Sequence, residues 1–472
     1  MLSRRSLLGT LAAPALAAPT RRPNFLIILS DDHHWQCVGA AGNPHVKTPN
    51  IDRLMARGVR FSDAVISTSQ CAPSRGILLS GLESYQTGLE SNGYTTFRHW
   101  KGRTAPEQLR RSGYDTILVG KWHIDVTPRE CGFSEAPLWL KPASSNYVNP
   151  QLRQGLDGAD QEVQGHITDL FTEAAEAALR DRKNPFLLWL SYTAPHTPWS
   201  EPERYRKPFE GRNAELAPPA WPKPTPEEAA RVAAQRAGAA KAGKKKGGKK
   251  GGFPDTGGRG GAVFDWETYY AVIHHLDEGV GRVIAALERT GQWDNTLVVF
   301  LGDNGYLCGA RGLQGKVYPW DQSIRIPFTV SGGVVKKPGV SDAPAASVDV
   351  PATLLDYAGV KPSHRMAGLS LKPVVNGGRF GRQENFSSWN DGRVEALFAG
   401  VAVEPYRAVR GGGWKYILWE SRKEALYDLR TDPAEARDLS GEASQAPALA
   451  RMRSALKRRM KETADPAAGW LT

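Results

Sequence analysis

The chain is poor in cysteine, with only four among its 472 residues. They are Cys37, Cys71, Cys131 and Cys308. No two of them form a Cys-x-x-Cys pair, which excludes the common zinc-binding and thioredoxin-like motifs. So few cysteines cannot supply a disulfide framework, and the fold must depend on its apolar core instead.

The chain also lacks a basic stripe on any predicted helix or strand. Its net charge is +12, but six lysines lie in one Gly/Lys-rich stretch, Lys241–Lys250, and removing them leaves +6. A nucleic-acid-binding protein needs its basic residues on a structured element, so we expect no nucleic-acid partner. Internal repeats are absent as well. Apart from the N-terminus, no apolar run approaches membrane-spanning length, so we expect no stable membrane insertion.

The N-terminus has the composition of an export signal. Arg4 and Arg5 precede an Ala/Leu-rich run that ends near Ala18, with small residues around a possible cleavage site. This arrangement predicts a signal peptide over residues 1–20, and the arginine pair is similar to a twin-arginine signal. The protein is therefore expected to be exported, periplasmic or secreted. The alternative is a frayed N-terminal helix on a cytosolic protein.

Continuous apolar runs alternate with amphipathic helical patterns along most of the chain. The predicted strands are Asn24–Ser30, Thr116–Gly120, Pro185–Ser191, Leu297–Leu301 and Ile326–Ser331. The predicted helices are Ile51–Arg57, Ala105–Arg111, Asp169–Arg182 and Trp266–Arg289. Uninterrupted apolar strands are typical of strands buried on both faces. The alternation predicts an α/β fold, a large and mainly parallel sheet sandwiched by helices.

The composition changes twice along the chain. Residues 210–262 are rich in Pro, Ala, Gly and Lys, and we expect a disordered surface insertion there. From about Arg379 three short strand patterns, 406–409, 414–419 and 425–429, precede a helical pattern over 446–463. We therefore expect a catalytic domain over 21–378 and a smaller C-terminal α+β subdomain over 379–472, with a short antiparallel sheet and a helix.

Acidic residues follow two of the predicted strands. Asp31 and Asp32 come directly after the first strand, and Asp303 and Asn304 follow Leu297–Leu301. Ligands gather beyond the carboxyl ends of parallel strands, so these side chains are expected at one edge. Adjacent carboxylates repel one another unless a cation neutralises them, and an oxygen-only set suits calcium or magnesium. The alternative for an Asp pair is a helix cap in a solvated turn.

The most informative stretch is Ser69–Gly81, which reads SQCAPSRGILLSG. Cys71 precedes a proline that suits the first turn of a helix, and Arg75 can lie on the same helical face. A lone cysteine is more often a buried apolar residue. The form Cys-x-Pro-Ser-Arg, however, resembles the signature of the type I sulfatases (formylglycine-dependent, arylsulfatase-like enzymes of the alkaline phosphatase superfamily). In that family the cysteine is oxidised to Cα-formylglycine by a maturation enzyme, and its hydrated aldehyde is the nucleophile.

Further motifs of that family occur at the ends of other strands. Gly120–His123 reads GKWH, and Pro195–Pro198 reads PHTP. The resemblance implies that Lys121, His196 and a second lysine, Lys316, contact the sulfate. It also implies an alkaline-phosphatase-like fold, and one calcium held by Asp31, Asp32, Asp303, Asn304 and the modified residue 71. A C-terminal LYDL sequence at Leu426–Leu429 is similar to the small-domain motif of the family.

The family mechanism assigns a role to each of these side chains. Cationic groups must converge because an anionic sulfate ester resists attack by an anion. Arg75 would orient the hydrated aldehyde, whose one oxygen attacks sulfur while His196 or Lys316 assists the leaving alcohol. His123 would remove a proton from the second hydroxyl, which expels sulfate and regenerates the aldehyde. A sulfated small molecule or glycan is the expected substrate.

Two other functions remain open at this point. A phosphate or phosphonate ester hydrolase of the same superfamily shares the metal and the nucleophile. A catalytically inactive binder of sulfated glycans needs a broken core motif, and none is found. Cys308 stands where many relatives carry His before Gly309, which leaves the core set intact but bears on the substrate subtype.

Overall fold

The computed structural model describes residues 22–471, except for 94–95, 219–220, 224–225, 227–228, 231–263 and 393–402. The predicted signal peptide and the Lys-rich part of the predicted insertion lie outside the described residues. Within the described start of that insertion, Leu216 is fully buried in a cluster with Phe209 and Tyr270. No helix in the described part of the chain is long and apolar enough to cross a membrane.

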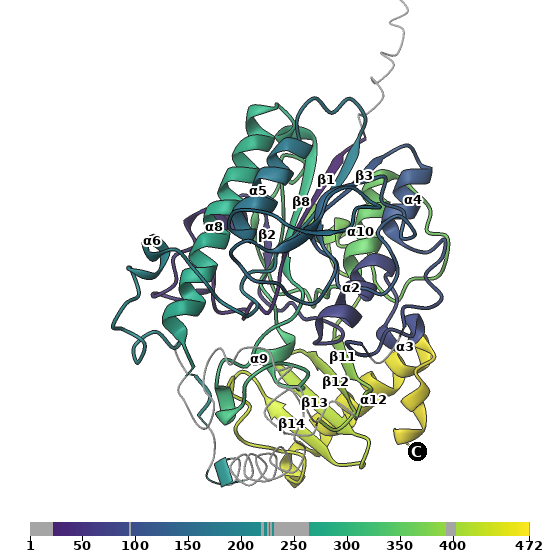
Figure 1. The fold of residues 1–472 in the computed structure, drawn as a ribbon. Helices are drawn as coiled ribbons and strands as arrows, with labels where there is room; N and C mark the ends of the chain where they lie inside the picture. Colours follow the sequence, from purple (N-terminus) through teal and green to yellow (C-terminus); the bar gives the residue numbers. More distant parts are fainter. Residues whose placement is uncertain are drawn as a thin grey trace, which may run out of the picture.

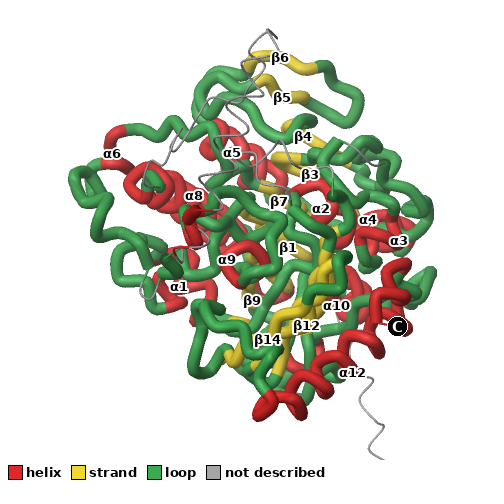
Figure 2. The backbone as a smooth tube through the Cα atoms, turned by 90° about the horizontal axis from the view of Figure 1, so that it is seen from below, coloured by secondary structure: helices red, strands yellow, loops and turns green. Residues whose placement is uncertain are grey.

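A ten-stranded sheet forms the centre of the larger part of the molecule (Figures 1 and 2). Its strands are β1 (Asn24–Ser30), β2 (Val59–Phe61), β3 (Asp115–Lys121), β4 (Glu135–Leu140), β5 (Gln151–Arg153), β6 (Asp160–Glu162), β7 (Phe186–Ser191), β8 (Thr296–Gly302), β9 (Phe328–Ser331) and β10 (Gly339–Ser341). Their order is β10-β2-β9-β8-β1-β7-β3-β4-β5-β6. The central strands β8, β1, β7, β3 and β4 are parallel, whereas β9 runs antiparallel to β8 and to β2.

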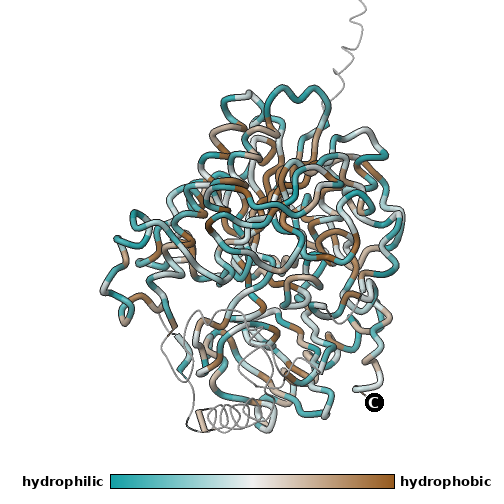
Figure 3. The backbone as a smooth tube through the Cα atoms, viewed as in Figure 1, coloured by the Kyte–Doolittle hydropathy of each residue, from teal (hydrophilic) through white to brown (hydrophobic). Residues whose placement is uncertain are grey.

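Strand β1 shows why the central strands are continuously apolar. It pairs with β8 on one side and β7 on the other, and every one of its residues is buried. Phe25, Ile27 and Leu29 belong to the core on one face of the sheet, and Leu26 and Ile28 to the core on the other. Side chains alternate between the faces of a strand, so a strand covered on both sides must be apolar throughout. Figure 3 shows this hydrophobic centre in brown.

Helices cover both faces of the sheet. The longer ones are α1 (Pro49–Ala56), α2 (Cys71–Ser80), α4 (Ala105–Arg111), α5 (Ile167–Ala178), α8 (Trp266–Arg289) and α10 (Asp349–Ala358). The shorter ones are α3 (Ser84–Thr87), α6 (Glu203–Arg206), α9 (Asp321–Ile324) and α11 (Lys372–Val375). The apolar residues of α1, α5 and α8 share one core cluster, and those of α2, α4 and α10 share the other. The predicted α/β sandwich is thereby confirmed.

The C-terminal part is a separate antiparallel sheet with one long helix, as predicted. The strands β11 (Asn385–Trp389), β12 (Tyr406–Gly411), β13 (Trp414–Trp419) and β14 (Glu424–Asp428) lie in sequence order, and α12 (Ala446–Thr463) follows them. Leu449, Met452, Leu456 and Met460 of α12 pack on one face of this sheet. Their spacing of three and four residues is that of a single helix stripe. Strand β11 was not predicted from the sequence.

A buried ion pair fixes the end of the chain to this sheet. Arg407 on β12 donates from Nε and Nη2 to the two carboxylate oxygens of Asp465, at 2.6 and 2.8 Å. Both side chains are almost completely buried. The guanidinium also donates to the carbonyl oxygens of Trp389 and Tyr406. All of the charge on this arginine is therefore compensated inside the protein.

We expect Asp465→Asn to lower the free energy of unfolding by about 3–5 kcal/mol, because it leaves a buried guanidinium without its counter-charge. The matched control is Asp157→Asn, which breaks the exposed pair with Arg129 and should cost less than about 1 kcal/mol. Urea unfolding followed by tryptophan fluorescence measures both. Equal losses for the two variants would contradict the assigned role of the buried pair.

Candidate active site

Polar side chains from four neighbouring strands meet at one edge of the large sheet. They are Asp31 and Asp32 after β1, Lys121 at the end of β3, His196 beyond β7, and Asp303 and Asn304 after β8. The four strands are adjacent and parallel, in the order β8-β1-β7-β3, so their carboxyl ends lie together. This is the edge at which open α/β sheets bind ligands.

Cys71 is the first residue of α2 and is completely buried. Gln70 before it is the N-cap of the helix and has an extended backbone. The Cys71 Sγ lies 3.3 Å from Asp31 Oδ1 and 2.8 Å from Lys316 Nζ. Burial and the negative charge of Asp31 raise the pKa of the Cys71 thiol to about 12. An unmodified thiol here stays protonated at neutral pH and is a poor nucleophile.

The acidic residues form one compact group around Cys71. One ligand atom each from Asp31, Asp32, Cys71 and Asp303 lies within 4.8 Å of all the others. Asn304 donates from Nδ2 to Asp32 Oδ1 at 2.6 Å, whereas its own Oδ1 is buried and accepts no hydrogen bond from the part of the chain that the structure describes. A buried amide oxygen without a donor, beside three carboxylates, fits a hard cation that takes oxygen ligands. These residues could hold calcium or magnesium.

Three cationic side chains balance the three carboxylates. Lys121 forms an ion pair with Asp31, and Lys316 forms one with Asp32. Arg75 Nη2 lies 2.8 Å from Asp303 Oδ2. All three cations are buried, so the protein groups alone already sum to zero charge. A divalent cation bound here would leave the site with an excess positive charge, which favours an anionic substrate.

The pKa values of two carboxyls show how closely these charges interact. Burial alone would raise the pKa of Asp31, but the charges of Lys121, His196 and Arg75 hold it well below its usual range. Burial and the charge of Asp31 raise the pKa of Asp303 to about 7. Two like charges in one buried site cannot both ionise freely. A bound cation removes this conflict because it favours the charged form of both.

Two histidines flank the group. His196 Nε2 lies 3.8 Å from Asp32 Oδ2, and burial together with the charge of Lys121 lowers the pKa of His196. His123 has a positive φ of 56°, and its buried Nδ1 has no hydrogen-bond partner among the described residues. Burial, with the charges of Lys121 and Arg75, lowers the pKa of His123 well below its ordinary value. A neutral imidazole beside fixed cations can accept a proton.

A cleft of about 550 Å³ reaches this edge of the sheet. Its lining includes Ala72, which follows Cys71 in the chain, and His123, which lies two residues after Lys121. Asp125, Lys141 and Asp160 contribute charged groups to its walls. Each residue predicted for the site from the sequence therefore lies at this edge, and a cleft leads to it.

Several supporting residues were not identified from the sequence. Ser191, the last residue of β7, accepts a hydrogen bond from Arg75 Nη1 at 2.6 Å, and the Lys121 carbonyl accepts another at 2.7 Å. Gly120 has φ 102°, and a Cβ there would lie 2.0 Å from the Ser191 carbonyl oxygen. Only glycine lets β3 pass β7 at this point. The GKWH motif includes Gly120 and Lys121, but no motif in the sequence pointed to Ser191.

A second buried cluster lies behind His196. The Tyr147 hydroxyl donates to the His196 carbonyl oxygen at 2.6 Å, and its ring packs edge-on against His166. Glu201 joins His166 and His275, with His275 Nδ1 at 2.7 Å. Burial alone would lower the pKa of His275. The hydrogen bonds to Asp169 and Glu201 and the charges of these two residues outweigh burial and raise it. Sequence reasoning missed this layer because none of its residues belongs to a recognisable motif.

The remaining cysteines are not part of the site. Cys37, Cys131 and Cys308 are buried and free, and so is Cys71. Cys308 lies in an apolar and aromatic cluster with Cys37, Phe264 and Tyr269. Its thiol has a raised pKa, mainly through burial. The unusual residue before Gly309 therefore acts as a small apolar side chain beside the site.

Comparison with known proteins agrees with this geometry. A family model described as sulfatase matches residues 23–360. A second, described as N-sulphoglucosamine sulphohydrolase, C-terminal, matches residues 309–463. The N-acetylglucosamine-6-O-sulfatase of Bacteroides thetaiotaomicron is 26% identical over 519 residues, which cover 98% of this chain and 91% of that protein.

Solved structures show the same fold. A structure in complex with its substrate D-glucosamine-2-N,6-O-disulfate superimposes with a TM-score of 0.77 at 24% identity, covering 94% of this chain and 99% of that chain. The phosphonate monoester hydrolase of Agrobacterium radiobacter gives a TM-score of 0.73 at 22% identity, covering 94% and 96%. The first family model alone spans more than half of the sequence. The chain belongs to the type I sulfatase family of the alkaline phosphatase superfamily.

Proposed function

We propose that this enzyme hydrolyses sulfate monoesters of carbohydrates, with a formylglycine derived from Cys71 and one calcium ion. The observation that carries the proposal is the position of Cys71. Its Sγ lies at the start of α2, 3.3 Å from a carboxylate of the predicted cation site and 2.8 Å from Lys316 Nζ. A nucleophile at this atom is held beside both the cation and a sulfate-binding lysine.

The expectation of a carbohydrate rests on the relatives and on the cleft. Two of the relatives named above, an N-acetylglucosamine-6-O-sulfatase and a protein in complex with D-glucosamine-2-N,6-O-disulfate, have sulfated glucosamine derivatives as substrates. Asp125, Lys141, Gln151 and Asp160 line the cleft that leads to His123. Such carboxylate, amide and ammonium groups can hydrogen-bond the hydroxyl groups of a sugar. They would orient the leaving alcohol toward the sheet edge.

The charges of the site account for binding of the sulfate. When bound, calcium would supply Lewis-acid stabilisation of developing negative charge. Asp31, Asp32, Asp303 and Asn304 would hold it, since their oxygens converge in the structure. Lys121 and Lys316 are fixed by these carboxylates and can donate hydrogen bonds to sulfate oxygens without reorganising. Preorganised donors of this kind favour the transition state over the free ester.

The protons are moved by the residues around Cys71. One hydroxyl of the hydrated residue 71 would attack sulfur and lose its proton to a neighbouring base. Lys316 Nζ, which lies 2.8 Å from residue 71, or a protonated His196 would give a proton to the departing alcohol oxygen and regain one from the attacking hydroxyl. His123 then takes the proton of the second hydroxyl, so that sulfate leaves and the aldehyde reforms. Arg75 orients residue 71 through its bonds to Asp303 and Ser191. His123 suits the role of base because its pKa is lowered and its ring is neutral.

A phosphate or phosphonate ester hydrolase is the second candidate, because a phosphonate hydrolase shares the fold. The comparison of 4-nitrophenyl sulfate with 4-nitrophenyl phosphate and with a phosphonate monoester, 4-nitrophenyl phenylphosphonate, decides between them. We expect the highest kcat/KM for a sulfate ester. A higher kcat/KM for the phosphate or the phosphonate ester would overturn the assignment of a sulfate ester as the substrate. An inactive binder would turn over none of them.

The modification of Cys71 is tested by mass spectrometry. In protein matured by a formylglycine-generating enzyme, we expect the peptide with residue 71 about 18 Da below the unmodified form, because an aldehyde replaces the thiol. Cys71→Ser should fold normally but be nearly inactive, since one hydroxyl cannot both attack sulfur and expel sulfate. An unmodified Cys71 in protein from the native source that hydrolyses sulfate esters would contradict the proposed nucleophile.

The cation site is tested by Asp31→Asn and Asp303→Asn. Each removes a charged ligand, and we expect kcat/KM for 4-nitrophenyl sulfate to fall by at least about 10²–10³-fold. Asp294→Asn, an exposed carboxylate outside these motifs, is the control and should change nothing. Chelation should abolish the wild-type activity, and calcium should restore it. Full activity in a metal-free preparation would disprove the cation site.

Export is proposed on the sequence of the N-terminus. The double variant Arg4→Lys and Arg5→Lys should leave unprocessed precursor in the cytoplasm, because twin-arginine export depends on the arginine pair. Cell fractionation with an antibody to the protein measures this. The matched control is Arg21→Lys with Arg22→Lys, an arginine pair that follows the predicted signal, and it should be exported normally. Undiminished export of the first variant would exclude the twin-arginine route.

A further inference from the structure

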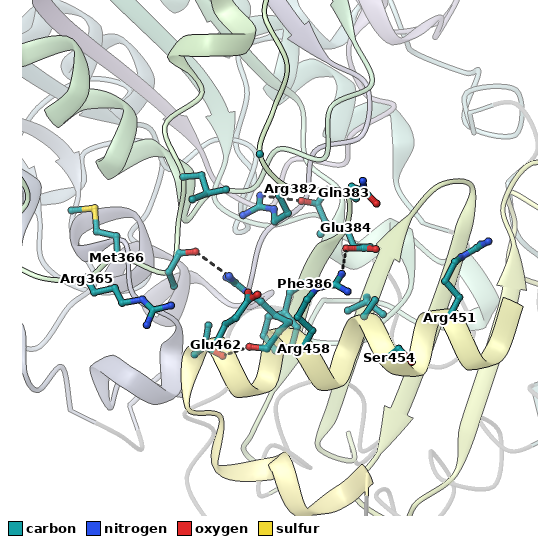
Figure 4. A pocket seen from close by; sticks show the side chains of 18 residues that line it. Arg365, Met366, Arg382, Gln383, Glu384, Phe386, Arg451, Ser454, Arg458 and Glu462 are labelled. Atoms are coloured by element: carbon teal, nitrogen blue, oxygen red, sulfur yellow. Dashed lines mark hydrogen bonds and ion pairs between the residues drawn. The ribbon is translucent and has the colours of Figure 1, made fainter. Parts of the chain in front are cut away.

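A second cleft, of about 730 Å³, lies along helix α12 (Figure 4). Its walls are one side of α12, the start of β11 with the residues before it, and the segment 365–369. Two glutamates line it against five arginines: Arg365, Arg382, Arg451, Arg458 and Arg459. The lining residues therefore carry a net formal charge of +3, part of which is offset by buried carboxylates behind the wall.

This cleft is separate from the active site. The backbone N–H of Ala367, in its wall, donates to the carbonyl of Gly81 at 2.8 Å. Gly81 is the C-cap of α2, whereas Cys71 is the first residue of that helix. A ten-residue helix is about 15 Å long, so α2 separates the two sites by about that distance. A single small ester cannot occupy both.

Two of the arginines are held in place by buried carboxylates. Arg382 Nη2 lies 2.6 Å from Asp349 Oδ2, and Arg459 Nη2 lies 2.6 Å from Glu83 Oε1. The Nε atom of each is buried and has no hydrogen-bond partner in the described structure. These guanidinium groups are rigid, and their charges are compensated by the two carboxylates. They form a fixed wall of the cleft, so binding of a charged ligand depends on the other three arginines.

The other three arginines are exposed and spaced apart. Arg458 pairs with Glu384 at 2.8 Å, while Arg365 and Arg451 have no ion pair within the described chain. Figure 4 shows Arg365 and Arg451 toward opposite ends of the cleft, with Arg458 between them. Seven residues separate Arg451 from Arg458 on α12, about 10 Å of helix rise. Cations so spaced suit an extended ligand with repeated anionic groups better than one small anion.

We infer that this cleft, with Arg365, Arg451 and Arg458, binds a sulfated polysaccharide chain at a distance from the active site. The inference rests on the proposed function, which makes a sulfated carbohydrate the substrate. A polymer held along α12 raises the local concentration of its sulfate esters near the catalytic edge. The ligand class follows from the charge pattern, since repeated sulfate groups match separated guanidinium groups.

Binding to heparin, measured by isothermal titration calorimetry, tests this inference. The full chain carries Cys71→Ala so that no turnover occurs during the titration. We expect the triple variant Arg365→Gln, Arg451→Gln and Arg458→Gln to raise Kd by at least about tenfold, because it removes three charge-assisted contacts. The double variant Arg365→Gln and Arg451→Gln keeps the pair with Glu384 and should show a smaller rise.

The matched control removes three positive charges outside the cleft: Lys183→Gln, Lys457→Gln and Lys461→Gln. These lysines are exposed, and two of them lie on α12. We expect the control to change Kd less than about twofold at physiological salt. Equal weakening by both triple variants would show diffuse attraction only and overturn the inference. An unchanged Kd in the cleft variant would overturn it too.

Two further measurements separate this inference from its alternatives. With Cys71 intact, the cleft variant should keep the wild-type kcat/KM for 4-nitrophenyl sulfate but show a raised KM for a sulfated polysaccharide. Duplex DNA of matched charge should bind more weakly than heparin and respond less to the cleft variant. Equal responses would assign the cleft to polyanions in general, against our inference. A wild type inactive on every sulfate ester would contradict the proposed function, while the titrations would still decide the cleft.

Discussion

The constraint on which the rest of the structure depends is charge compensation in a buried site. Asp31, Asp32 and Asp303 are out of contact with water, and each is paired with Lys121, Lys316 or Arg75. Removing ions from water is costly unless their partners are already in place. The parallel order β8-β1-β7-β3 supplies those partners, because it brings the ends of strands far apart in sequence to one edge. Helix α2 then places residue 71 among them.

The strands that could be predicted from the sequence are those in which nearly every residue is buried among apolar neighbours. Strands β1, β3, β7 and β8 are buried on both faces, and their apolar runs were recognisable for that reason. Strand β6 has the sequence DQE and is exposed along its whole length, so no local pattern could identify it. It exists because β5 offers a free edge. The residues of the site were found through their motifs. Their pairing was not, because the paired residues lie between 90 and 284 positions apart in the chain.

The position of Cys71 in the fold determines the chemistry of its thiol, because burial raises the pKa of that group. A buried cysteine beside a carboxylate is a weak nucleophile, although the surrounding cations are arranged for attack on an anionic ester. The same position occupied by a hydrated aldehyde has two hydroxyl groups and no thiol to ionise. In the proposed function the second of these hydroxyl groups, which a thiol lacks, would allow sulfate to be expelled. In our further inference an extended substrate binds in the arginine cleft along α12, which lies away from these charges.

The central claim is that this site attacks the sulfur atom of a sulfate ester, so that the S–O bond of the ester breaks and its C–O bond stays intact. Hydrolysis in water enriched in ¹⁸O tests it most directly, because the hydrate of an aldehyde takes its oxygens from the solvent. The account predicts one solvent oxygen in the released sulfate and none in the released alcohol. Solvent oxygen in the alcohol would mean attack at carbon and would contradict the account.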